Sequence, residues 1–267
     1  MKNMFLKNKQ DRLSHNKIPT KEIELKKRLG IPLNINFKPV KLLIGIPSRG
    51  MVSAHWVIPL LKQGNPINTT IEYRFIIGKE VGIARNELVE EALKMKADYL
   101  FFLDDDVIIS PNTITRLINI ADEKKDIVAG VYYTKQIPPQ PLIFKGRGTG
   151  SFKNWKVGEI LDDIDGVGMG LTLIKTEIFE KLKKPWFKTI EAEKFTTKQG
   201  QVISFSTDEA LYFCNKAIAK GFRITVDTSI QGIHYDCETD TFYFNSKGKP
   251  VAVRKGKVIF PITPSQE

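Results

Sequence analysis

The chain has 267 residues and 42% apolar residues, enough to bury the core of one large α/β domain or two small ones. Its two cysteines, Cys214 and Cys237, form no C-x-x-C pair, which excludes a disulfide framework and makes the reducing cytoplasm the expected location. No apolar run approaches the length of a membrane span, and the N-terminus lacks the pattern of a signal peptide.

The net charge of +11 is concentrated near the N-terminus. Residues 1–41 contain eleven Lys or Arg and three Asp or Glu, a balance of +8, so the remaining residues carry only +3. We therefore predict a basic N-terminal arm over 1–38, partly disordered or helical, with Lys21 to Leu29 as the short helix. Such an arm suits peripheral contact with an anionic membrane or with nucleic acid, and it is equally compatible with a solvated segment.

The next part of the chain alternates apolar runs with amphipathic segments. This alternation is typical of an α/β fold with a mostly parallel central sheet and right-handed crossovers. Strands are predicted over 40–46, 71–77, 97–103 and 126–133, and helices over 52–61, 83–96 and 110–121.

The second half is less regular. A strand over 171–174, helices over 176–182 and 206–220, and a strand over 222–226 are predicted there. Residues 185–205 are expected to form a long excursion or lid, and the tail from Lys247 has strand-like pieces. The expected domain division is an arm (1–38), one domain (39–236, with halves 39–133 and 134–236) and a C-terminal tail (237–267).

Three consecutive carboxylates end the apolar strand 97–103: Asp104, Asp105 and Asp106. Adjacent like charges are costly unless a positive group neutralises them, and hard oxygen ligands suit Mg²⁺, Mn²⁺ or Ca²⁺. In open α/β sheets, ligands bind just beyond the carboxyl ends of the strands. The pattern favours a metal–phosphate site, with a solvated acidic turn as the alternative.

Two further segments carry groups suited to chemistry. His234 follows a predicted strand and a turn of small residues, and its imidazole is a plausible further metal ligand or, alternatively, a loop side chain bonded to backbone. Ser206 and Glu209 have the spacing of a capping box, which gives Glu209 a structural explanation. Asp208 lies at the predicted helix start, where the helix dipole favours an ionised carboxylate able to accept a proton from a hydroxyl.

Glycines and cations supply the remaining candidates. Gly166, Gly168 and Gly170 alternate, which permits close approach of a ligand or of another strand, and a bent strand explains them equally well. Arg85 at the start of a helix has donors suited to phosphate, with a surface salt bridge as the alternative.

Taken together, these residues resemble the GT-A glycosyltransferases, most closely those of family 2, over about residues 40–236. The order and spacing of the motifs carry the similarity more than any single one. The motifs are Pro47-Ser48-Arg49, Gly82-Ile83-Ala84-Arg85-Asn86, Leu103-Asp104-Asp105-Asp106, Gly166 to Gly170, Thr207-Asp208-Glu209 and His234. The resemblance implies a GT-A (Rossmann-like) sheet flanked by helices, with an acceptor-side C-terminal half.

The resemblance also implies roles for individual residues. Metal ligands for Mn²⁺ or Mg²⁺ would be Asp104, Asp106 and His234. The nucleotide-sugar site would comprise Pro47, Ser48, Arg49, Glu80, Arg85, Asp104, Asp105 and Gly168. Asp208 would be the general base of an inverting transfer, with Glu209 as the second catalytic candidate. The partners implied are a UDP- or GDP-sugar and an acceptor that is a glycan, lipid, protein or nucleic acid.

Two departures from the family pattern bear on the donor. After the second strand only Glu80 is acidic, where the family often has an acidic pair, so the nucleobase is not indicated. The Pro47-Ser48-Arg49 turn also differs from the usual ending of the first strand. The alternatives are a nucleotidyltransferase that makes an activated sugar, and a nucleic-acid or membrane-surface binding protein that uses the basic arm.

Overall fold

The computed structural model describes residues 39–122, 125–146, 150–196 and 202–261. Contacts within the chain divide it into two units, Met1–Lys38 and Pro39–Glu267, and the described residues all belong to the second. The predicted basic arm over 1–38, with its short helix, therefore lies outside the described residues. Within the described part, no helix is long and apolar enough to cross a membrane.

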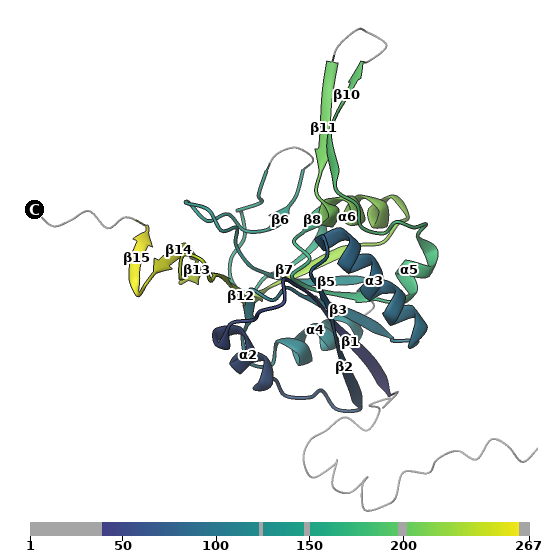
Figure 1. Cartoon of the computed structure of the whole chain (residues 1–267), viewed down its shortest axis with the longest axis horizontal. Coiled ribbons are helices and arrows are strands. Elements are labelled where there is room, and N and C mark those ends of the chain that lie inside the picture. Colours follow the sequence, from purple (N-terminus) through teal and green to yellow (C-terminus); the bar gives the residue numbers. More distant parts are fainter. Residues whose placement is uncertain (1–38, 123–124, 147–149, 197–201, 262–267) are drawn as a thin grey trace, which may run out of the picture. The chain divides into compact units, whose positions relative to one another are not determined.

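The described elements are mainly strands, with five helices between them (Figure 1). The helices are α2 (Ala54–Leu61), α3 (Val81–Lys94), α4 (Thr113–Asp122), α5 (Glu177–Lys181) and α6 (Glu209–Ala219). The strands are β1 (Val40–Ser48), β2 (Thr69–Ile77), β3 (Tyr99–Leu103), β4 (Val107–Ile109), β5 (Ile127–Val131), β6 (Ile143–Phe144), β7 (Ile160–Ile164), β8 (Gly166–Val167), β9 (Leu171–Lys175), β10 (Ile190–Thr196), β11 (Val202–Thr207), β12 (Ile224–Asp236), β13 (Thr241–Ser246), β14 (Lys249–Arg254) and β15 (Lys257–Phe260).

The main sheet has the order β15-β14-β13-β12-β5-β9-β3-β1-β2, with β4 and β7 paired to β12. Strands β2, β1 and β3 are parallel, as are β5 and β12, whereas β9 is antiparallel to both β3 and β5. The expected α/β fold with a largely parallel central sheet is confirmed, and the antiparallel β9 makes that sheet mixed. The strand-like pieces of the C-terminal tail form β14 and β15, which continue the sheet through antiparallel pairs.

Helices cover both faces of the central sheet (Figure 1). Successive residues of a strand point to opposite faces, so Leu43 joins one buried cluster while Leu42 and Ile44 join the other. The first cluster contains the inward faces of α3, α5 and α6, and the second contains those of α2 and α4. Strand β3 is buried on both faces and is apolar throughout. The polar residues that follow it, beginning with Asp104, lie at the carboxyl end of this central strand.

Two predictions for the second half need correction or refinement. The capping box at Ser206 is wrong, because Thr207 still pairs with Ile190 as the last residue of β11. The helix begins at Glu209, and Asp208 is its N-cap: its Oδ1 accepts a hydrogen bond from the Leu211 backbone N–H at 2.7 Å. The excursion predicted over 185–205 contains β10 and most of β11, which pair antiparallel.

Candidate active site

The three aspartates lie just beyond the carboxyl end of β3 and directly before β4. Asp104 is fixed through its backbone: its N–H donates to the Gly170 carbonyl at 3.1 Å, and its own carbonyl accepts from Trp56 Nε1 at 2.9 Å. Strand β1 runs parallel to β3, so the ends of these two strands meet at one edge of the sheet. This edge is where open α/β sheets bind ligands.

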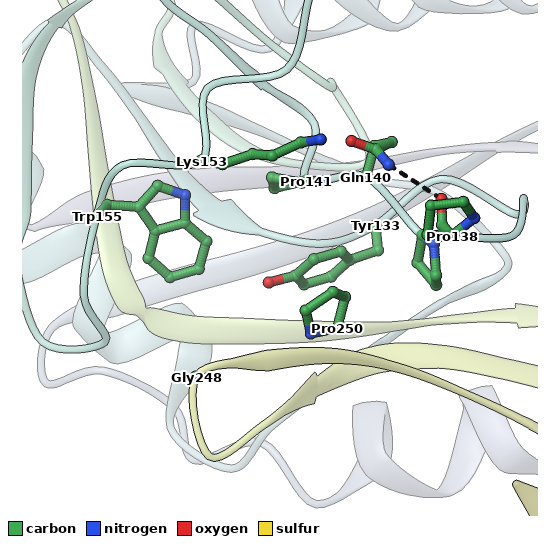
Figure 2. Close-up of a pocket in the computed structure, with 9 residues that line it drawn as sticks. Tyr133, Pro138, Gln140, Pro141, Lys153, Trp155, Gly248 and Pro250 are labelled. Atoms are coloured by element: carbon green, nitrogen blue, oxygen red, sulfur yellow. Dashed lines mark hydrogen bonds between the residues drawn. The ribbon is translucent and has the colours of Figure 1, made fainter. Parts of the chain in front are cut away.

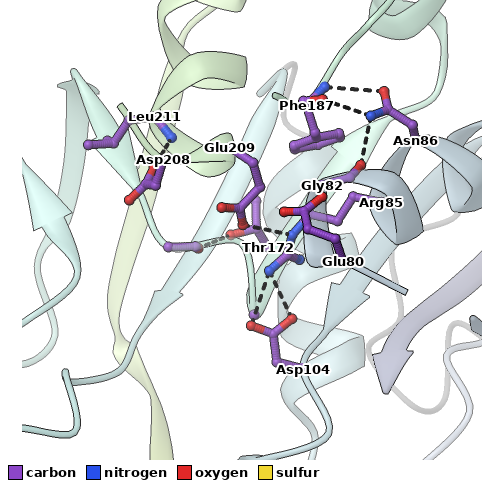
Figure 3. Close-up of polar contacts among 12 residues, drawn as sticks. Glu80, Gly82, Arg85, Asn86, Asp104, Thr172, Phe187, Asp208, Glu209 and Leu211 are labelled. Carbon is purple, nitrogen blue, oxygen red and sulfur yellow. Dashed lines mark hydrogen bonds and ion pairs between the residues drawn. The ribbon is translucent and has the colours of Figure 1, made fainter. Parts of the chain in front are cut away.

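Arg85 is the centre of a buried ion-pair cluster that joins α3, β3 and α6 (Figure 3). Its Nη2 lies 3.0 Å from Asp104 Oδ1, and its Nε lies 3.2 Å from Glu209 Oε1. The side chain is only 3% exposed, and Nη1 is buried with no hydrogen-bond partner in the described part of the chain. Burial alone would lower the pKa of Arg85, but the charges of Asp104 and Glu209 outweigh it and raise that pKa.

Asp105 faces the end of β1. Its Oδ2 accepts a hydrogen bond from the Arg49 backbone N–H at 3.2 Å, and Ser48 also bonds this carboxylate. Burial dominates and raises the pKa of Asp105, although both hydrogen bonds act against the rise. The Arg49 side chain itself is exposed and reaches Glu238. The structure therefore brings Ser48 and the Arg49 backbone to the aspartates.

Asp106 lies between an imidazole and an ammonium group. Strand β12 pairs with β4 so that His234 is opposite Val107, and this register places His234 Nε2 3.3 Å from Asp106 Oδ1. Lys135 Nζ lies 2.6 Å from the other oxygen, Oδ2. Burial acts to raise the pKa of Asp106, but His234 and Lys135 together hold it well below the ordinary value.

The second nitrogen of His234 defines its tautomer. Nδ1 lies 2.6 Å from the Tyr133 carbonyl oxygen, which can only accept a hydrogen bond, so Nδ1 carries the proton. Nε2 therefore meets Asp106 either as the donor of an imidazolium or as the lone pair of a neutral ring. A neutral Nε2 beside a carboxylate is the arrangement of a metal ligand, with the opposite nitrogen bound to backbone.

The residues expected to hold a metal are brought together in part. Asp106 and His234 are adjacent, whereas Asp104 is bound to Arg85. Over the described ranges, no group of three or more His, Cys, Asp or Glu could hold an ion. Asp106 and His234 offer one carboxylate and one imidazole, so a cation there would need substrate phosphate oxygens to complete its coordination.

The alternating glycines leave room for side chains of this site. A Cβ on Gly170 would lie 2.5 Å from Asp104 Oδ2, and one on Gly168 would lie 2.3 Å from the Tyr132 hydroxyl oxygen. That hydroxyl in turn accepts a hydrogen bond from the Gly170 N–H at 3.0 Å. Gly168 and Gly170 thus leave space for the side chains of Tyr132 and Asp104. A contact of Gly168 with a nucleotide sugar stays a prediction.

Glu80 and Asn86 have identifiable local roles. Glu80 is the N-cap of α3, accepting from the Ile83 N–H at 3.0 Å. Asn86, next to Arg85, binds the backbone of Trp186 and Phe187 through its side-chain oxygen (Figure 3). Pro47 is the residue before Ser48 at the end of β1.

Sequence reasoning missed Lys135 and Tyr132. Lys135 lies in the proline-rich loop that follows β5. The path of this loop brings its ammonium group to 2.6 Å from Asp106 Oδ2. Tyr132 is buried beside Gly168 and Gly170, and burial together with the nearby Asp104 raises the pKa of its hydroxyl. Neither residue has a local sequence signal, although the small residues of 166–170 indicate that something bulky lies against them.

Comparisons with known proteins support the resemblance. The family described as glycosyl transferase family 2 matches residues 71–182. Among solved structures, A197 from STIV has 26% identity and a TM-score of 0.53, with 80% of this chain and 93% of that chain covered. TarS from S. aureus has 14% identity and a TM-score of 0.41, with 72% of this chain and 36% of that chain covered. A comparison with curated proteins gives no match.

The matched segment contains most of β2, all of α3 and β3, and the three aspartates, and so includes both Arg85 and Asp104. The chain is therefore similar to family 2 glycosyltransferases over residues 71–182, and its α/β architecture with a large mixed sheet is consistent with the GT-A fold.

Proposed function

We propose that the protein transfers a sugar from a nucleotide-sugar donor, a UDP- or GDP-sugar, to an acceptor hydroxyl with inversion at the anomeric carbon. The observation that supports this most is the buried Arg85 cluster at the carboxyl edge of the sheet. It joins the first aspartate after β3 to the start of α6, so the donor-side and base-side motifs meet in one place.

The donor would lie along the ends of β1 and β3. The Arg49 backbone N–H and Ser48 lie beside Asp105, which is suited to accept from ribose hydroxyls. Arg85 has a buried Nη1 without a partner in the described residues, and a diphosphate oxygen is one acceptor that would satisfy it. Pro47, Glu80 and Gly168 complete the proposed donor site.

Asp106 and His234 would hold a divalent cation, Mn²⁺ or Mg²⁺, with Asp104 as a third candidate ligand. When bound, such a cation neutralises charge on the diphosphate as it leaves. Lys135, 2.6 Å from Asp106, is a second positive group on the same carboxylate. A cation at Asp106 and this ammonium would therefore compete for one carboxylate oxygen.

Asp208 would take the proton. In the transfer, the acceptor oxygen bonds to the anomeric carbon, the bond from that carbon to the diphosphate oxygen breaks, and the hydroxyl proton passes to Asp208. The N-cap bond from the Leu211 backbone N–H orients this exposed carboxylate. Glu209 is held by Arg85 with its side chain 12% exposed, so we assign it to positioning Arg85.

The test is a pair of variants at Asp208, measured for turnover and for nucleotide binding. Asp208→Asn retains the cap acceptor but cannot take a proton, and we expect turnover to fall by about 10²–10⁴ with nucleotide binding unchanged. Asp208→Ala also loses the cap and should cost about 0.5–2 kcal/mol of stability. Unaltered turnover in Asp208→Asn, or pyrophosphate release from a nucleoside triphosphate, would contradict the proposal. The anomeric configuration of the product, read by NMR, tests inversion.

A further inference from the structure

A pocket of about 200 Å³ lies beside Tyr133 (Figure 2). Three separate segments form it: the loop that follows β5, the segment around Trp155, and the turn between β13 and β14 at Gly248 and Pro250. The loop is held in place by its own hydrogen bonds, because the Thr134 N–H donates to the Gln140 carbonyl at 2.8 Å. The loop that forms one side of the pocket is therefore held in a defined conformation.

The walls of this pocket are mostly rings whose polar atoms are already bonded to the protein. Trp155 Nε1 donates to the Phe152 carbonyl at 3.1 Å, which fixes the indole. The Tyr133 hydroxyl accepts from Asn245 Nδ2 at 2.9 Å. Since these polar atoms are engaged, the indole offers mainly its apolar face, and a flat or ring-shaped ligand can stack on it.

Positive charge surrounds the same pocket. A second hollow, of about 490 Å³, shares Trp155 and Gly248 with the first. Lys153, Lys156 and Lys247 are among the residues that line the two hollows. The residues that line these hollows include no Asp or Glu. Figure 2 shows Lys153 extending over the first pocket toward Gln140. This charge complements an anionic ligand.

Tyr133 connects the pocket to the transfer site. Its ring lines the pocket, while its carbonyl oxygen binds His234 Nδ1 at 2.6 Å, and His234 in turn faces Asp106. A ligand in the pocket would thus be separated from Asp106 by Tyr133 and His234. The pocket is smaller than the ~300–1,000 Å³ of sites that enclose drug-sized ligands, so it suits one ring rather than a complete nucleotide sugar.

We propose that this pocket binds one sugar ring of an acidic glycan, and that this glycan is the acceptor. The binding site stands on the pocket itself, whereas the acceptor role rests on the proposed function. Stacked rings with basic residues also occur in proteins that bind single-stranded nucleic acid. The acidic glycan is favoured because the chain is similar to glycosyltransferases and because a pocket of about 200 Å³ has room for about one ring.

In the experiment, the full chain is titrated separately with a short oligogalacturonate, a neutral malto-oligosaccharide and a single-stranded oligonucleotide. Binding is measured through the change in tryptophan fluorescence. Trp56 and Trp186 are buried, at 2% and 3% exposure, so Trp155 is the tryptophan that a ligand in the pocket would contact. We expect saturable binding of the oligogalacturonate that weakens with added salt. Preference for the neutral sugar or for the oligonucleotide would overturn the proposal.

Two variants and a control assign the binding to the pocket. Trp155→Ala should weaken oligogalacturonate binding about tenfold or more, and the surface change Lys153→Ala should weaken it several-fold without affecting folding. The matched control is Lys257→Ala, an exposed lysine on β15, which should bind like the unaltered chain. For Trp155→Ala and Lys257→Ala, binding is measured by calorimetry as well, so that loss of the fluorophore is not mistaken for loss of binding. Equal binding by Lys153→Ala and Lys257→Ala would refute the site.

Nucleotide titration of the same sample separates the two proposals. If UDP or GDP binds but the oligogalacturonate does not, the pocket assignment fails and the proposed function is unaffected. If the oligogalacturonate binds through Trp155 and Lys153 and no nucleotide binds, the pocket assignment holds and the proposed function fails.

Discussion

Replacing Arg85 with Met should remove a buried positive charge that the carboxylates of Asp104 and Glu209 share. Arg85 is 3% exposed and lies 3.0 Å from Asp104 and 3.2 Å from Glu209, whose side chains are 23% and 12% exposed. Removing one partner of a buried ion pair typically costs about 3–5 kcal/mol, because the remaining charges lose their compensation. For a domain of this size, that loss corresponds to roughly 6–20 °C in the melting temperature.

The assay is urea denaturation at about pH 8 and about pH 5, with the free energy of unfolding compared between the variant and the unaltered chain. In Arg85→Met the two carboxylates repel each other, and protonation in acid relieves this repulsion. The loss should therefore be larger at the higher pH. The control is Arg74→Met, since Arg74 pairs with Glu72 at 2.9 Å but both side chains are nearly half exposed. Such a pair is worth at most about 1 kcal/mol.

Equal losses in Arg85→Met and Arg74→Met would refute the reasoning. A loss in Arg85→Met that did not depend on pH would also refute it, because the cost would then come from packing rather than from uncompensated charge.

Three further predictions follow from named contacts. Burial raises the pKa of Cys214 to about 12, so a thiol reagent at neutral pH should label the exposed Cys237 alone in the folded chain. Because Cys214 ionises more readily once the chain unfolds, the free energy of unfolding should fall as the pH rises above about 9. Rapid labelling of both cysteines in the folded chain would contradict this. Gly170→Ala, whose Cβ would meet Asp104 Oδ2 at 2.5 Å, should weaken nucleotide binding at least about tenfold, whereas Gly64→Ala, with its nearest contact at 3.6 Å, should not. Lys135→Met frees Asp106 Oδ2 and should strengthen Mn²⁺ binding up to about tenfold in calorimetry; unchanged or weaker binding would argue against a cation at Asp106.

Several elements of the fold could be predicted because their signals are local. The run over 97–103 is apolar throughout, and the corresponding strand β3 is buried on both faces. The helical spacing of Leu88, Val89 and Ala92 likewise places them in the buried face of α3. The orientation of β9 had no such signal, since an apolar run reads the same whether its partner strands are parallel or antiparallel.

The site was less accessible to sequence reasoning because its contacts are distant along the chain. Arg85 and Glu209 are 124 positions apart, and only the order of short motifs suggested that they belong together. Lys135 reaches Asp106 through the path of a loop, which no local pattern encodes. At Ser206 a local signal was misleading: the capping-box spacing is present, but pairing of Thr207 with Ile190 keeps the chain extended until Asp208.

The central claim is that the edge formed by Asp104, Asp105 and Asp106 binds a nucleotide sugar. Calorimetric titration of UDP, GDP and their sugars, with Mn²⁺ and with a chelator, tests this most directly. The account predicts that one nucleotide binds, that binding strengthens with Mn²⁺, and that Asp106→Ala abolishes the Mn²⁺-dependent part while Lys257→Ala leaves it unchanged. Absence of nucleotide binding under all of these conditions, in a chain shown to be folded, would contradict it.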